Sequence, residues 1–112
     1  MGKIDLSLTT WIIFLIAALL EVGGDALIRK GLKGTSVLWI VIGGLVLAGY
    51  GLVVNTVKWD FSRLLGVYVA VFAVISVLCG QVIFKENIPL TTWLGLSIIV
   101  IGGLIIQFGA VR

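Results

Sequence analysis

Four long apolar stretches follow one another along the chain. They cover residues 9–28, 37–57, 64–84 and 90–109, and the short connections between them hold most of the charged residues. Each stretch is close to the roughly 20 residues that a helix needs to cross a bilayer. The apolar runs are continuous, whereas a membrane β-barrel needs alternating segments of about 10 residues. The pattern therefore predicts an all-α membrane protein with four transmembrane helices in a single domain over residues 1–112.

The composition supports a location in the membrane. Hydrophobic residues make up 61% of the 112 positions and charged residues 12%, and the mean hydropathy is +1.28. A soluble domain this small could not bury so much apolar surface. The first apolar stretch is too long for the core of a cleavable signal and contains an acid. We therefore expect a multi-pass protein of the inner cell membrane, surrounded by the lipid bilayer.

Residues that carry enzymatic chemistry are sparse. The chain has one Cys and no His, which argues against a zinc site and a catalytic triad. There is no phosphate-binding glycine loop, so we expect neither an enzyme nor a bound cofactor. The net charge of +3 is scattered over short connections, and we expect no nucleic-acid partner.

Aromatic and basic residues near the predicted helix ends bear on topology. The four Trp residues, Trp11, Trp39, Trp59 and Trp93, fall near these ends, as anchors at the membrane interface do. With four spans, one side of the membrane carries Lys3, Lys58, Arg63 and Arg112, and the other carries Arg29, Lys30, Lys33 and Lys85. The positive-inside rule assigns no orientation to this equal division. Insertion both ways round would allow an antiparallel homodimer, which we expect because four short helices are few to enclose a substrate pathway.

Glu21 falls near the middle of the first apolar stretch. A charge at that depth costs at least about 2.5–3.5 kcal/mol, so an acid there indicates a functional site. The low dielectric disfavours the carboxylate, and we expect Glu21 to bind a proton. Asp25 and Arg29 follow one and two turns later on the same face. We interpret Asp25 and Arg29 as a structural ion pair and Glu21 as the titrating group; a permanently protonated Glu21 bonded to another helix is the alternative.

Four more residues are candidates for lining the site. Gly24 lies between the two acids, and its small size would let another helix approach and set how tightly the Glu21 pocket closes. Tyr50, Tyr68 and Phe72 offer aromatic faces over which an organic cation could sit. Ordinary packing is the alternative for each of these aromatic residues.

The fourth apolar stretch carries a glycine stripe. Gly95, Gly102 and Gly109 are spaced by seven residues, which keeps one stripe in register along a helix. Such a stripe would gain nothing from facing lipid. We therefore predict a helix–helix contact there, with the same helix of a second subunit.

These features together resemble the small multidrug resistance family of the drug/metabolite transporter superfamily. The resemblance covers essentially the whole chain, and the first-helix motif over residues 20–29 reads Leu-Glu-Val-Gly-Gly-Asp-Ala-Leu-Ile-Arg. It places the family's essential glutamate at Glu21, its nearby glycine at Gly24, its third-helix tyrosine at Tyr68 and two fourth-helix glycines at Gly95 and Gly102. The resemblance implies an antiparallel homodimer in which two Glu21 residues share a pocket and exchange protons for a cation.

Two departures from that family bear on the substrate. Val71 stands about where the family has a substrate-stacking Trp, and Asp25 replaces a residue that is usually uncharged. Both weaken the expectation of a polyaromatic drug cation. The favoured function is a proton-coupled exporter of small cations or metabolites. A flippase subunit for a lipid-linked carrier and a non-transporting assembly protein are the alternatives, and under the last Glu21 should tolerate Gln.

Overall fold

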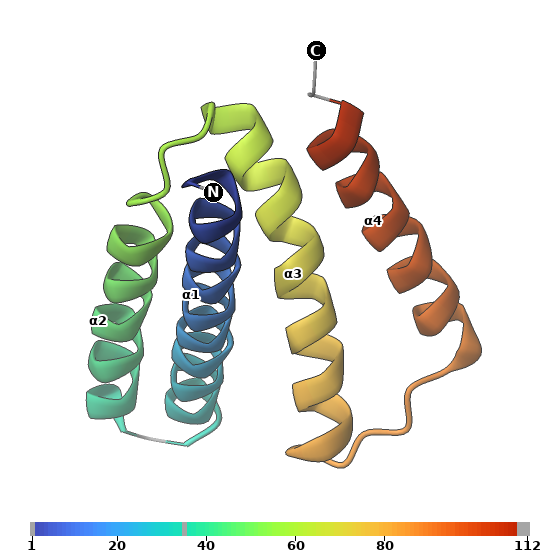
Figure 1. Ribbon diagram of the computed structural model, residues 1–112. Coiled ribbons are helices and arrows are strands. Elements are labelled where there is room, and N and C mark those ends of the chain that lie inside the picture. The colour runs from blue at the N-terminus through green and yellow to red at the C-terminus, as the bar shows by residue number, and fades with distance from the viewer. Residues whose placement is uncertain (1, 35, 110–112) are drawn as a thin grey trace. The chain divides into compact units, whose positions relative to one another are not determined.

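The computed structural model describes residues 2–34 and 36–109, with side chains from Leu8 onward. The described residues form four α-helices and no strand (Figure 1). The helices are α1 (Gly2–Lys33), α2 (Val37–Val54), α3 (Phe61–Val82) and α4 (Leu90–Gly109). All four are long and apolar enough to cross a membrane, which confirms the predicted all-α membrane fold. The termini of the predicted domain, including Arg112 of the topology count, and the side chain of Lys3 lie outside this description.

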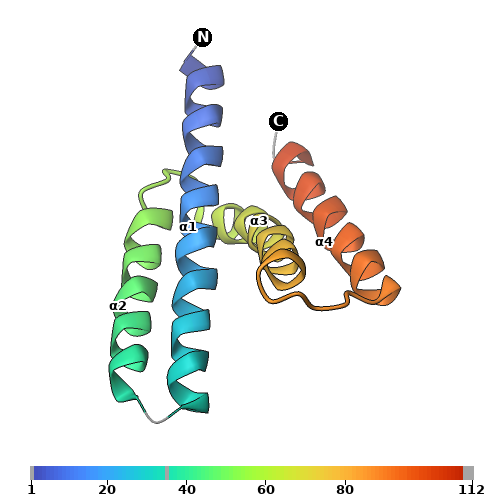
Figure 2. The ribbon, with the colours of Figure 1, turned by 90° about the horizontal axis from the view of Figure 1, so that it is seen from below.

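The chain divides into two compact units, residues 1–57 and residues 58–112. Each unit is a helical hairpin: α1 packs on α2 in the first, and α3 packs on α4 in the second. In the first unit the two helices lie side by side in both views, and α1 extends past the last turn of α2 (Figure 2).

The first helix is longer than predicted. It begins at Gly2 and ends at Lys33, whereas the apolar pattern placed its ends at residues 9 and 28. The charged residues after position 28 are Lys and Arg, which are good helix formers. Lys30 and Lys33 also lie in the last turn, where a positive charge interacts favourably with the helix dipole. Polarity therefore marked the edge of the apolar stretch and not the end of the helix.

The second helix is shorter than predicted, ending at Val54 instead of residue 57. The Asn55 side-chain amide donates a hydrogen bond of 2.8 Å to the Gly51 carbonyl. The Thr56 hydroxyl donates one of 2.7 Å to the carbonyl of Val53. Such local side-chain bonds compete with the helical pattern of backbone bonds. Together they satisfy the last carbonyls of α2 and end it.

The third helix begins and ends earlier than predicted, at Phe61 and Val82. Beyond its end the amide of Glu86 donates to the Gly80 carbonyl over 2.9 Å. Lys85 makes this reversal possible with a φ of 54°, a left-handed conformation that few non-glycine residues adopt. The fourth helix has the predicted bounds, residues 90–109, directly after Pro89.

In the first unit the two helices meet at glycines. Gly24 of α1 and Gly43 of α2 face each other, and a Cβ on Gly43 would lie 2.7 Å from the Gly24 carbonyl oxygen. One more contact lies two turns along α1, where a Cβ on Gly31 would come within 2.6 Å of Ile40. Only hydrogen fits at these positions, so the backbones of α1 and α2 approach closely.

In the second unit α3 and α4 approach each other closely at Gly103. A Cβ there would lie 2.7 Å from the Cβ of Ala70. Gly66 is covered in the same way by Ile106, 2.8 Å from an added Cβ. Further along the hairpin a pocket of about 340 Å³ lies between the helices, lined by Ala73, Ser76, Val77, Thr92, Gly95, Leu96 and Ile99.

Candidate functional site

Glu21 lies at the middle of the span that α1 offers to the membrane. This span runs from Leu8 to Lys33, 26 residues, so Glu21 is near its midpoint and about 20 Å of helix lies on either side. Its side chain is half-buried. The longer helix thus leaves the depth predicted for Glu21 unchanged.

Tyr50 of α2 joins Glu21 in the first unit. Its side chain is half-buried and lies within electrostatic range of both Glu21 and Asp25. The Gly24–Gly43 contact sets the register of the two helices that brings these side chains together. A carboxyl pair beside a phenol supplies negative charge, a hydroxyl dipole and an aromatic face, all of which suit an organic cation.

The expected ion pair between Asp25 and Arg29 is not formed. Both side chains are exposed, and the described residues show no nitrogen–oxygen contact within 4.0 Å between them. Asp25 therefore remains available to a ligand one turn from Glu21.

Gly24 is buried in the contact between α1 and α2. An added Cβ would lie 2.8 Å from the Leu47 side chain and 3.0 Å from the Gly43 carbonyl oxygen. Its neighbour Gly23 has no such atoms within 4 Å. Gly24 thus acts on the site by setting the spacing of the helices that carry Glu21 and Tyr50.

Tyr68 and Phe72 belong to the second unit. They lie one turn apart on α3 with ring centroids 6.3 Å apart and an interplanar angle of 32°. Tyr68 is 2% exposed, and Phe72 is half-buried. The two rings pack against each other within the second unit.

The predicted glycine stripe of α4 is open. Added Cβ atoms on Gly95, Gly102 and Gly109 would meet nothing within 4 Å. The glycine that packs against α3 is Gly103. It lies in the same apolar stretch but is not one of the three glycines spaced by seven residues. Gly95 and Gly102 are half-buried, and Gly95 and Gly109 each line a pocket together with residues of α3 or its start. The stripe thus borders the α3-facing side of α4 without packing closely against α3.

Sequence reasoning counted Arg63 only as a loop charge. The Arg63 guanidinium lies over the Trp59 ring at 4.0 Å from its centroid, and it donates a hydrogen bond of 3.0 Å to the side-chain oxygen of Gln107. Lys30 lies in a similar way 4.2 Å from the Trp39 ring centroid in the first unit. Two of the Trp anchors thus also hold a cation, a role that the nearby Arg and Lys could have suggested.

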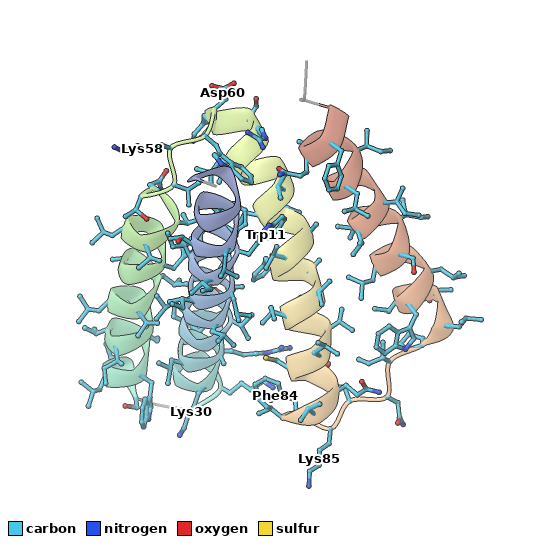
Figure 3. All side chains as sticks on the ribbon, viewed as in Figure 1. Trp11, Lys30, Lys58, Asp60, Phe84 and Lys85 are labelled. Carbon is cyan, nitrogen blue, oxygen red and sulfur yellow. The ribbon has the colours of Figure 1, made fainter. Side chains whose placement is uncertain are left out.

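Charged side chains otherwise gather at the ends of the helices. In the second unit Lys58 and Asp60 lie at one end and Lys85 at the other (Figure 3). Among the described residues, no three His, Cys, Asp or Glu side chains are close enough to hold a metal ion. The charged group that stands apart from this arrangement is the acidic face of α1.

Comparison with known proteins gives a family match along most of the chain. The model of a family described as "Uncharacterised BCR, YnfA/UPF0060 family" matches residues 7–112. A UPF0060 membrane protein of Staphylococcus carnosus is 38% identical over 96 residues, which cover 84% of this chain and 89% of the relative. One of Desulfitobacterium hafniense is 34% identical over 93 residues, covering 81% and 86%. No solved structure matches this chain.

Proposed function

This chain belongs to the YnfA/UPF0060 family of membrane proteins, and we propose that it is a proton-coupled exporter of small cations or metabolites. The observation that carries the proposal is Glu21, half-buried at the midpoint of α1. An ionisable group at that depth is costly and marks proton or substrate pathways in membrane proteins. The resemblance to the small multidrug resistance family supports the same function.

The mechanism follows from competition for one carboxyl. A protonated Glu21 is neutral and tolerates the low dielectric, whereas an ionised Glu21 needs a cation beside it. Binding of a cationic substrate therefore releases the proton, and binding of a proton releases the substrate. Tyr50 supplies its ring and hydroxyl to the bound cation, and Asp25 adds a second negative charge one turn away.

The working unit in this proposal is an antiparallel homodimer in the inner cell membrane. Two copies would contribute two Glu21 residues to one cavity and would contact each other along the glycine stripe of α4. Added Cβ atoms on the stripe would meet nothing within 4 Å in the single chain, which leaves room for a second copy beside it. Alternating exposure of the cavity to the two sides of the membrane would then couple proton entry to substrate exit.

Proton release on addition of a ligand tests the proposal. Purified protein in weakly buffered detergent receives a panel of quaternary ammonium, guanidinium and small amine compounds, and the pH change is recorded. We expect at least one compound to release protons from the wild type and none to do so from Glu21→Gln. Glu86→Gln is the matched control, because it removes an exposed carboxyl from the connection between α3 and α4.

Two results would contradict the proposal. One is equal proton release from the wild type and from Glu21→Gln, which would place the titrating group elsewhere. The other is that neither the wild type nor Glu21→Gln releases protons, although the two proteins are equally stable. That second result would favour a flippase subunit or a non-transporting assembly protein.

A further inference from the structure

A second pocket lies at the end of the second unit where α3 begins and α4 ends. It has a volume of about 530 Å³ and is lined by Asp60, Ser62, Arg63, Ile105, Ile106 and Gly109. Because both helices span the membrane, this pocket lies at the level where a span meets the lipid headgroups. Its lining is charged on the α3 side and apolar on the α4 side.

Arg63 is held in place on one wall of this pocket. Its guanidinium stacks on Trp59 and donates to Gln107, so two contacts fix its plane. Its Nε is buried and has no hydrogen-bond partner among the described residues. A guanidinium offers five N–H donors in a fixed fork that matches the oxygens of a phosphate. Because Nε is buried, a ligand can reach only the terminal nitrogens, one of which already donates to Gln107. Arg63 is therefore a positioned cation that meets a ligand through its terminal N–H groups.

Asp60 lines the same pocket three residues before Arg63. It is exposed, makes no capping hydrogen bond to α3, and forms no ion pair with Arg63 in the described structure. Two opposite charges thus line one pocket without neutralising each other. A ligand that carries both a phosphate and an ammonium group would satisfy both.

We propose that this pocket binds the headgroup of a zwitterionic phospholipid with a primary ammonium group, as in phosphatidylethanolamine. The phosphate lies on Arg63 and Ser62, and the ammonium group lies on Asp60. Ile105 and Ile106 face the glycerol and the first part of the acyl chains. This site is independent of the Glu21 site and of the transport proposal, since it lies at the membrane surface in the other unit.

The test is competitive lipid retention by the full-length protein. Delipidated protein in detergent receives equal amounts of phosphatidylethanolamine, phosphatidylglycerol and phosphatidylcholine with the same acyl chains, and native mass spectrometry counts the lipid bound. We expect the wild type to retain phosphatidylethanolamine about three- to tenfold better than the other two, because a primary ammonium donates charge-assisted hydrogen bonds to a carboxylate.

Two variants separate the two charges. Asp60→Asn keeps a good N-cap residue before α3 and should bring retention of phosphatidylethanolamine down to that of phosphatidylglycerol. Arg63→Lys keeps the charge but loses the planar fork and should lower retention of all three lipids. Lys85→Gln and Glu86→Gln remove matched charges at the other end of the unit and should leave retention unchanged.

Three outcomes would overturn the proposal. Equal retention of the three lipids by the wild type would show no headgroup site. An Asp60→Asn variant with the wild-type ratio of phosphatidylethanolamine to phosphatidylglycerol would show that Asp60 does not bind the ammonium group. Displacement of the lipid by an equal concentration of free phosphoethanolamine would assign the pocket to a soluble phosphate compound instead.

Discussion

Tyr50 is the residue of α2 that lies near the two acidic side chains of α1. Its side chain lies within electrostatic range of Glu21 and Asp25, so its hydroxyl can take part in binding a cation there. Tyr50→Phe keeps the ring and removes only the hydroxyl. We expect the affinity for a cationic ligand to fall about two- to tenfold, the usual net effect of one hydrogen bond, with thermal stability unchanged.

The contribution of Tyr50 can be separated from an effect on folding by a double-mutant cycle. Ligand affinity is measured by calorimetry for the wild type, Tyr50→Phe, Glu21→Gln and the double variant. If both residues act on one cation, the double variant loses no more affinity than Glu21→Gln alone. Additive losses would mean that Tyr50 acts somewhere other than at the Glu21 site.

Lys85 has the one positive φ that a non-glycine residue adopts in the described chain. The left-handed conformation costs a residue with a Cβ about 1–2 kcal/mol. A glycine avoids this cost, but part of the gain in stability is lost because glycine raises the conformational entropy of the unfolded chain. We expect Lys85→Gly to raise thermal stability in detergent slightly, by up to about 1 kcal/mol. Lys85→Ala removes the same charge but keeps the Cβ, and should not. Equal stability of the two variants would contradict this account.

Two adjacent glycines of α2 provide a matched test of helix packing in the first unit. A Cβ on Gly43 would lie 2.7 Å from both the Gly24 carbonyl oxygen and the Ile28 side chain, whereas one on Gly44 meets nothing within 4 Å. Gly43→Ala should therefore force α1 and α2 apart and destabilise the protein by about 1–3 kcal/mol. Gly44→Ala should be neutral or stabilise it by up to about 1 kcal/mol.

Denaturant unfolding followed by circular dichroism measures both glycine variants. Proton release should fall with Gly43→Ala as well, because the same contact sets the distance from Glu21 to Tyr50. Equal stability of the Gly43 and Gly44 variants would mean that α1 and α2 do not pack at this register.

The sequence predicted which elements exist better than where they end. Four apolar runs specify four spans, and Pro89 marked the start of α4 correctly because proline suits the first turn of a helix. The end of α2 was missed because it depends on two side-chain hydrogen bonds, from Asn55 and Thr56, which the apolar pattern does not show. The end of α1 was missed because its charged residues continue the helix.

For the candidate site, the sequence predicted the depth of Glu21 in the membrane but not the residues that lie beside it. The position of Glu21 follows from counting residues in one span. Its proximity to Tyr50 depends on the register between α1 and α2, which the helix–helix contact sets. The bond from Arg63 to Gln107 joins residues 44 positions apart, so no local pattern predicts it. The contact of Gly103 with Ala70 within the chain was not predicted, and the predicted contact of the glycine stripe with a second subunit stays a prediction.

At the scale of the whole molecule, the open glycine stripe leads to a prediction about assembly. An added Cβ on Gly102 meets nothing in the single chain, so Gly102→Leu should leave the protomer folded. If a second copy covers the stripe, the larger side chain should separate the two α4 helices, since small residues allow such close approach. We expect the dimer fraction in detergent to fall and proton release to fall with it. Light scattering, or crosslinking with a reagent that does not react with cysteine, measures the dimer fraction.

A control on the same helix separates loss of the interface from a general effect of bulk. Leu104→Phe also enlarges an exposed apolar residue of α4, but two residues along the helix turn it about 200° from Gly102. It should leave the dimer fraction unchanged. Gly102→Leu with wild-type dimer content and transport would show that the stripe faces lipid, and the shared Glu21 cavity would then need another pairing of the two chains. Loss of dimer with Leu104→Phe alone would place the interface on the opposite face of α4.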